Sequence, residues 1–72
     1  MPNLPAGPVS SSNVSVVGPY SEKTGELEVS FKGGQTYSYT VPYSVAQGMV
    51  QAGSKGRYVH EVLNGYPYRR IA

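Results

Sequence analysis

The sequence predicts an α+β domain, in which a small antiparallel β-sheet of three to four strands carries two short helices packed on one face. Residues 26–32 alternate between apolar and polar side chains, which is the pattern of a half-buried strand. Gly33-Gly34 then indicates a hairpin turn, and residues 36–41 supply the return strand. Two segments with helical patterns follow, one over residues 43–52 and one from residue 54 to residue 63 or 64.

The chain has 72 residues, which is enough for one domain. A domain of this size buries only about 60% of the surface that its unfolded chain exposes, so its stability needs reinforcement. The chain has no cysteine and one histidine, which excludes disulfides and a structural zinc site. Small domains often gain stability by association, and we expect a homo-oligomer, either a dimer or a tetramer.

The first nine residues contain three prolines and one glycine, with little to bury. We therefore expect a flexible tail over residues 1–9 and a domain over residues 10–72. The tail lacks the charged and apolar regions of a signal peptide, and no apolar run approaches the roughly 20 residues that span a bilayer. A cytoplasmic protein without a membrane partner and without a cofactor is expected.

Local signals place the remaining elements. The first strand is expected over residues 14–17 and should end at Gly18-Pro19, because proline cannot donate to a strand ladder. Pro42 suits the start of the first helix, where its missing N–H costs nothing. Gly48 lies inside that helix, where it either allows close packing or is tolerated at a cost of roughly 1 kcal/mol. Residues 66–71 are expected to be extended and able to add an edge strand.

The register of the hairpin decides where Tyr37 and Tyr39 point, and the sequence leaves two registers open. If only Gly33-Gly34 form the loop, both tyrosines lie on the polar face, where they offer a binding or oligomer surface. If the loop has three residues, Phe31 opposes Tyr37, Val29 opposes Tyr39, and both tyrosines join the core face. We prefer the second register, because a short chain needs the roughly 150–250 Å² that each aromatic side chain buries.

The stretch from Ser54 to Tyr58 is the strongest candidate for ligand contact. Ser54 is a candidate N-cap for the second helix, and the free N–H groups of such a terminus attract anions. Lys55 and Arg57 add two full charges, Gly56 allows close backbone approach, and Tyr58 supplies a ring face. This combination suits a phosphate or a nucleotide. The alternative is a solvated helix start, in which Tyr58 packs into the core.

The basic charge is concentrated at the C-terminal end. Residues 1–53 hold two lysines and three glutamates, a net charge of −1, whereas residues 54–72 hold four basic residues and one glutamate, a net charge of +3. This excess predicts an anionic partner. It is too small to clamp a long duplex, where roughly 6–10 phosphate contacts are typical, so a small phosphorylated ligand or a short RNA fits better.

The sequence does not predict an enzyme. His60 is expected on the exposed side of the second helix, where an ordinary surface residue is the simpler interpretation. Glu26 and Glu28 share one strand face, whereas a paired-carboxylate mechanism needs its carboxylates across a cleft. Arg57 and Glu61 are four residues apart and can pair on the helix surface, which is the structural alternative for Arg57. No phosphate loop and no metal-ligand spacing occurs.

A series of short segments follows a recognisable order and spacing. The segments are Ser11-Ser12, the turn from Gly18 to Tyr20, Leu27-Glu28-Val29-Ser30-Phe31, Gly34, Tyr37-Ser38-Tyr39, Val41-Pro42, the run from Ala52 to Tyr58, Tyr66 and Tyr68. In these segments the chain resembles the KTSC domain, a short module named after the C-terminus of some lysyl-tRNA synthetases and also found as a stand-alone protein in bacteria and phages. The resemblance covers residues 9–71, with departures at Pro19, Thr40 and Val59.

The resemblance implies two functions. Attachment to a synthetase implies RNA binding. Stand-alone phage members resemble immune-evasion sponges of the anti-CBASS type, small oligomers that sequester the cyclic nucleotide signals of bacterial anti-phage defence. The small chain and its compact charge excess favour the sponge, with a cyclic dinucleotide or related nucleotide as the partner in the host cytoplasm. A short-RNA-binding module and a structural assembly protein are the alternatives.

The candidate ligand site combines phosphate contacts at the helix start, aromatic rings that stack on a base, two distal arginines and two loop serines. Stacking contributes about 1–3 kcal/mol per base, and the serines either hydrogen-bond the ligand or cap their loop. The arginines are expected to complete the charge at the sheet rim, either within one chain or from a neighbouring subunit. Replacing Arg57 by alanine is expected to abolish binding and to leave the fold intact. In the same order, the candidates are Lys55, Gly56 and Arg57; Tyr58, Tyr37 and Tyr39; Arg69 and Arg70; and Ser11 and Ser12.

Overall fold

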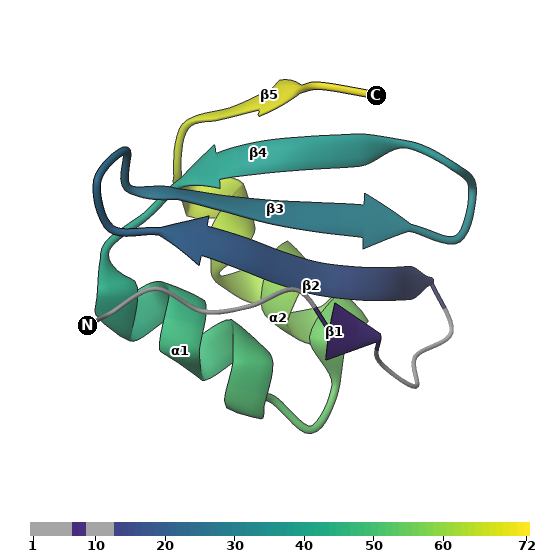
Figure 1. The fold of residues 1–72 in the computed structure, drawn as a ribbon. Coiled ribbons are helices and arrows are strands. Elements are labelled where there is room, and N and C mark those ends of the chain that lie inside the picture. Colours follow the sequence, from purple (N-terminus) through teal and green to yellow (C-terminus); the bar gives the residue numbers. More distant parts are fainter. Residues whose placement is uncertain (1–6, 9–12) are drawn as a thin grey trace.

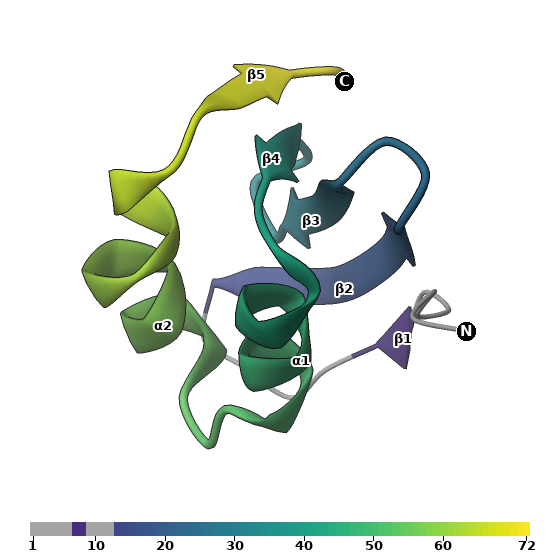
Figure 2. The same ribbon diagram turned by 90° about the vertical axis from the view of Figure 1, so that its left-hand side faces the viewer.

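A five-stranded antiparallel sheet, with the strand order β1-β2-β3-β4-β5, carries two helices on one face (Figures 1 and 2). The computed structural model describes residues 7–8 and 13–72. The predicted α+β class, with an antiparallel sheet and both helices on one face, is confirmed. In chain order the elements are β1 (Gly7–Pro8), β2 (Val14–Ser21), β3 (Glu26–Phe31), β4 (Thr36–Thr40), α1 (Tyr43–Gln51), α2 (Lys55–Glu61), the 3₁₀ turn η1 (Leu63–Gly65) and β5 (Tyr68–Arg70).

Two N-terminal predictions fall wholly or mostly outside the described residues. Ser11 and Ser12 lie outside the described residues. Of the expected tail over residues 1–9, only Gly7 and Pro8 are described, and they pair with Val17 and Val16 of β2. This two-residue strand is the element that extends the sheet beyond the three to four strands expected from the sequence.

The core lies between the sheet and the helices. The alternation of β3 places Leu27 and Val29 inside, and both are fully buried. Met49 of α1 is fully buried against this face. The Tyr20 hydroxyl donates a hydrogen bond to the Val41 carbonyl at 3.1 Å, which ties β2 to the segment after β4. The buried apolar residues are Val14, Val17, Tyr20, Leu27, Val29, Tyr39, Val41, Ala46, Met49 and Leu63.

The first strand does not end at Gly18-Pro19, and that prediction is wrong. β2 continues to Ser21, with a register shift against β3 between Val17 and Tyr20. Gly18 adopts a positive φ of 97° and the Gly18–Pro19 peptide is cis. Such a bulge leaves a residue outside the ladder, so a proline is accommodated within the strand without the loss of a pairing N–H.

The β3–β4 hairpin places both central tyrosines on the core face. Its loop runs from Lys32 to Gly34, and the Phe31 N–H donates to the Gln35 carbonyl at 2.8 Å. Tyr37 therefore pairs with Val29, and Tyr39 with Leu27. The preferred face is confirmed, but each partner lies two residues from the predicted one. A shift by two residues preserves the faces, because side chains alternate with a period of two.

The two helices begin where the sequence predicts and end earlier. Pro42 immediately precedes α1, and Ala52 caps its C-terminus instead of lying within it. Ser54 is the N-cap of α2, as predicted. The helical segment after Ser54 breaks after Glu61, and its remainder forms the separate turn η1.

Gly48 permits a close approach between the helices. The Tyr58 hydroxyl donates to the Val45 carbonyl of α1 at 2.9 Å, so the Tyr58 ring bridges α2 to α1. A Cβ atom at position 48 would overlap that hydroxyl. Close packing, one of the two interpretations of this glycine, is therefore its role.

Replacing Gly48 by alanine should lower the free energy of unfolding by about 1–2 kcal/mol, because the overlap with Tyr58 outweighs the helix propensity of about 1 kcal/mol that alanine adds. Chemical denaturation measures the change. In a Tyr58→Phe background the hydroxyl is absent, and the cost of the same substitution should shrink by about 1 kcal/mol. An equal cost in both backgrounds would show that the Tyr58 hydroxyl is not the reason why glycine is needed at position 48.

Candidate functional site

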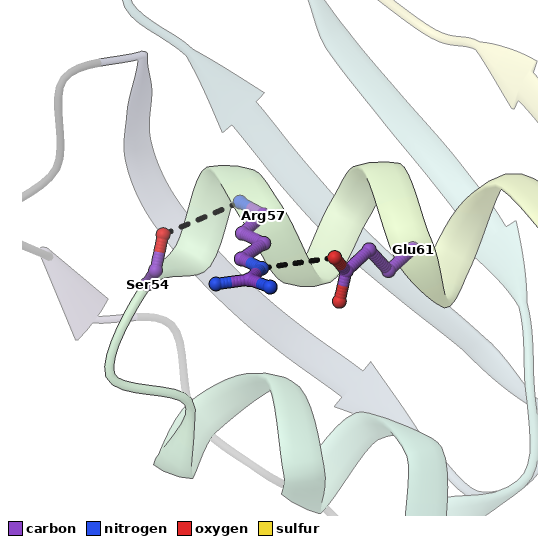
Figure 3. A network of polar contacts seen from close by, with 3 residues as sticks. All are labelled: Ser54, Arg57 and Glu61. Atoms are coloured by element: carbon purple, nitrogen blue, oxygen red, sulfur yellow. Dashed lines mark hydrogen bonds and ion pairs between the residues drawn. The ribbon is translucent and has the colours of Figure 1, made fainter.

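The start of α2 carries an exposed ion pair. The Ser54 hydroxyl accepts a hydrogen bond from the Arg57 N–H at 3.4 Å, and Arg57 Nε donates to Glu61 Oε2 at 2.9 Å (Figure 3). The side chain of Arg57 is 74% exposed. The hydrogen bond to Glu61, and then its charge, raise the pKa of Arg57. The predicted pairing of Arg57 with Glu61 is confirmed, and such an exposed pair is weak enough for an anion to compete with it.

Lys55 points back to the first helix. Its ammonium group donates to the Val50 carbonyl at 3.0 Å and to the Ala52 carbonyl. These carbonyls lie at the C-terminal end of α1, where the helix dipole is negative and the last turn holds no other basic residue. The charge of Lys55 thus neutralises the end of α1.

Gly56 and Tyr58 also face the protein. A Cβ atom at Gly56 would overlap the side chain of Asn13, so the close approach that this glycine allows is to the residue preceding β2. Tyr58 is half-buried, and burial, with a smaller effect of Tyr66, raises its pKa. Of the four candidates in this stretch, Arg57 is therefore the one whose side chain is exposed.

A second group of aromatic residues lies on β4 and β5. The ring centroids of Tyr37, Tyr39 and Tyr68, here called the tyrosine cluster, are 5.6–6.5 Å apart, and the Phe31 ring meets Tyr37 edge-on at 5.9 Å. These separations are typical of favourable aromatic pairs. Tyr39 is 5% exposed, Tyr37 is half-buried and Tyr68 is 57% exposed. The cluster thus runs from the core to the surface.

The two arginines that follow Tyr68 in β5 have different cross-strand partners in β4. Arg70 pairs with Tyr37 across the strands, and its Nε donates to the Ala72 carbonyl at 3.0 Å. Arg69 pairs with Ser38, and its guanidinium lies 3.4 Å from Glu26 Oε2. β5 is the edge strand that the sequence predicts, so the placement of both arginines at the rim is confirmed.

The structure separates the predicted site into two groups. The first turn of α2 contacts Asn13 beside β2, whereas Arg69 and Arg70 lie on β5, with β3 and β4 between those strands (Figure 2). Tyr37 and Tyr39 belong with the arginines, not with Lys55. Tyr68 also belongs to this second group, although it is not among the candidates predicted from the sequence. Its signal was its position two residues before Arg70 in an extended segment, which places both side chains on one face.

Burial shapes the electrostatics of the cluster. Desolvation of the Tyr39 phenol raises its pKa, and the neighbouring Tyr37 and Tyr68 add to the effect. Among the described residues no group of three or more histidine, aspartate or glutamate side chains could hold a metal ion. No helix over residues 7–8 and 13–72 is long and apolar enough to cross a membrane. This edge of the sheet offers an exposed ring with the guanidinium of Arg70 on its own face and that of Arg69 on the opposite face.

Comparisons with known proteins agree with the fold. A family model described as the KTSC domain matches residues 10–68. Among solved structures, the chain is similar to a KTSC domain protein from Yersinia pestis, with 37% sequence identity and a TM-score of 0.82. The match covers 93% of this chain and 96% of that protein. No curated protein matches the chain.

Replacing Lys55 by methionine should lower the free energy of unfolding by about 0.5–1 kcal/mol, because the last carbonyls of α1 lose their cation. Chemical denaturation at low ionic strength measures the loss. Lys23 is an exposed lysine in the β2–β3 turn and serves as the matched control, whose replacement should change stability by no more than a few tenths of a kcal/mol. Equal losses in both variants would contradict the capping role.

Tyr39 should make the fold sensitive to alkali. Its folded-state pKa is raised above the unfolded value of about 10, so the protonated form is favoured by folding. This contribution to stability is complete below about pH 10 and is lost as the pH rises through the folded-state pKa. Denaturation curves above pH 10 should therefore fall less steeply with pH for Tyr39→Phe than for the original chain. Parallel curves would contradict the assignment.

Proposed function

The chain belongs to the KTSC domain family, and we propose that it is a non-enzymatic nucleotide-binding protein whose ligand rests on the tyrosine cluster and Arg70 at the β5 edge. The observation that supports this most is the exposed ring of Tyr68, which packs on Tyr37 at 5.7 Å and on Tyr39 at 5.6 Å and shares its face of β5 with Arg70. A nucleotide presents a flat base and a phosphate, and these are the two groups that tyrosine and arginine recognise.

The leading ligand is a cyclic nucleotide signal. The net charge of the chain is only +2, which suits a compact anion with few phosphates. Tyr68 is 57% exposed, and its ring would cover one face of a base. A second copy of the chain would cover the other face. The protein would thus be a homo-oligomeric sponge, a dimer or tetramer in the cytoplasm of a bacterial host, that sequesters cyclic nucleotides of anti-phage defence and leaves them intact.

Short single-stranded RNA is the second candidate, and the openness of the surface favours it. The tyrosine cluster reaches solvent at an edge strand, where a strand of RNA can pass without entering a pocket. Aromatic rings and guanidinium groups along a sheet are the elements with which single-stranded nucleic acids are commonly bound. Binding without chemistry is proposed for both ligands, because the Glu26 carboxylate pairs with Arg69 on the face of the sheet opposite Tyr68.

Calorimetric titration with cyclic di- and trinucleotides, beside a short single-stranded RNA, tests the proposal. Saturable binding of one cyclic nucleotide with a shallow salt dependence, and recovery of the ligand intact after denaturation, is the expected result. Binding to RNA alone, with affinity that falls steeply with salt and tolerates many sequences, would move the function to the second candidate. Absence of binding to every ligand would contradict nucleotide binding and leave a structural assembly protein.

A further inference from the structure

The two neighbouring arginines of β5 lie on opposite faces of the sheet. Successive side chains of a strand alternate between faces, so Arg70 shares a face with Tyr68, and Arg69 does not. The cross-strand partners agree, because Arg70 pairs with Tyr37 of the tyrosine cluster and Arg69 pairs with Ser38. Adjacent residues of equal charge therefore have different surroundings.

Arg69 is engaged on the face away from the helices. Its guanidinium lies 3.4 Å from Glu26 Oε2, and Glu26 alternates with the buried Leu27 and so belongs to that outer face. The pair joins β5 to β3 across β4. Ser38, the cross-strand partner of Arg69 in β4, is 3% exposed. Arg69 thus lies on the face opposite the ring of Tyr68, and this difference of face distinguishes it from Arg70.

Arg70 stands beside the exposed ring. Residues two apart on a strand are separated by about 6.6 Å, a span that the sugar of one nucleotide bridges between its base and its phosphate. The contact of Arg70 with the Ala72 carbonyl uses Nε, one of five N–H donors of a guanidinium, and the residue is exposed. The terminal nitrogens are therefore placed to reach an anion next to Tyr68.

We infer that Tyr68 and Arg70 form a two-point contact for a single nucleotide unit, with the base stacked on Tyr68 and its phosphate bound by Arg70, and that Arg69 takes no part. The inference rests on the proposed function and assigns its roles. Tyr37 and Tyr39 act as positioning residues, because their rings support the inner side of Tyr68 and leave its outer side to the ligand. A cyclic nucleotide and a strand of RNA both carry this unit.

Arg69→Gln and Arg70→Gln are a matched pair for the test, because each removes one positive charge from the same strand. Tyr68→Leu removes the ring and keeps an apolar side chain, and Tyr68→Phe restores the ring without the hydroxyl. The probes are the cyclic dinucleotides of adenine, guanine and uracil and a short single-stranded RNA of mixed sequence. Circular dichroism and thermal unfolding of each variant establish that the fold is retained.

Tyr68→Leu and Arg70→Gln should each weaken binding about tenfold or more, measured with the probe that the unmodified protein binds. The dissociation constants of Arg69→Gln and Tyr68→Phe should stay within about threefold of the value for the unmodified protein. On ¹⁵N-labelled protein, the ligand should shift the Nε resonance of Arg70 and not that of Arg69. Equal losses in the two arginine variants, or full binding by Tyr68→Leu, would overturn the two-point contact and retain the proposed function. A wild-type protein that binds no probe would overturn both.

Discussion

The register of the β3–β4 hairpin is the constraint on which both the core and the candidate surface depend. It sets Tyr37 and Tyr39 on the face that the helices cover. β5 continues the same alternation, because Tyr68 pairs with Tyr39 and Arg70 pairs with Tyr37. A slip by one residue would turn both β4 tyrosines to the polar face and would leave Tyr68 without the rings on which it packs. The core and the proposed ligand contact thus form by the same strand pairing.

A chain of 72 residues uses the same aromatic side chains for stability and for recognition. The exposed fraction rises from 5% at Tyr39 to 57% at Tyr68 through rings that touch, so the innermost tyrosine belongs to the core and the outermost to the surface. A ring held in this way loses little conformational freedom when a base stacks on it, which favours binding. At the start of α2, by contrast, the side chains of Lys55 and Tyr58 serve stability, because both bind carbonyl groups of α1.

Side-chain periodicity predicts faces well and pairing partners poorly. Alternation over residues 26–32 was sufficient for the fold class and for the buried face, but registers that differ by two residues bury the same side chains, so the hairpin partners could not be chosen. The bulge at Gly18-Pro19 exists only in relation to β3, and local signals therefore ended the strand too early. The candidate site shows the same limit, because the sequence predicts the local position of a residue better than its contacts with other elements. The sequence placed Arg70 at the rim, whereas the direction of Lys55 depends on where α1 ends.

The central claim is that a nucleotide rests on the β5 edge and not on the start of α2. Intermolecular nuclear Overhauser effects between a bound cyclic dinucleotide and the aromatic protons of the protein test it most directly. Contacts from base protons to the ring of Tyr68, with none to Tyr58 or to the backbone around Gly56, are predicted by the exposure of these residues. Contacts confined to the first turn of α2 would contradict the claim and would restore the helix start as the binding site.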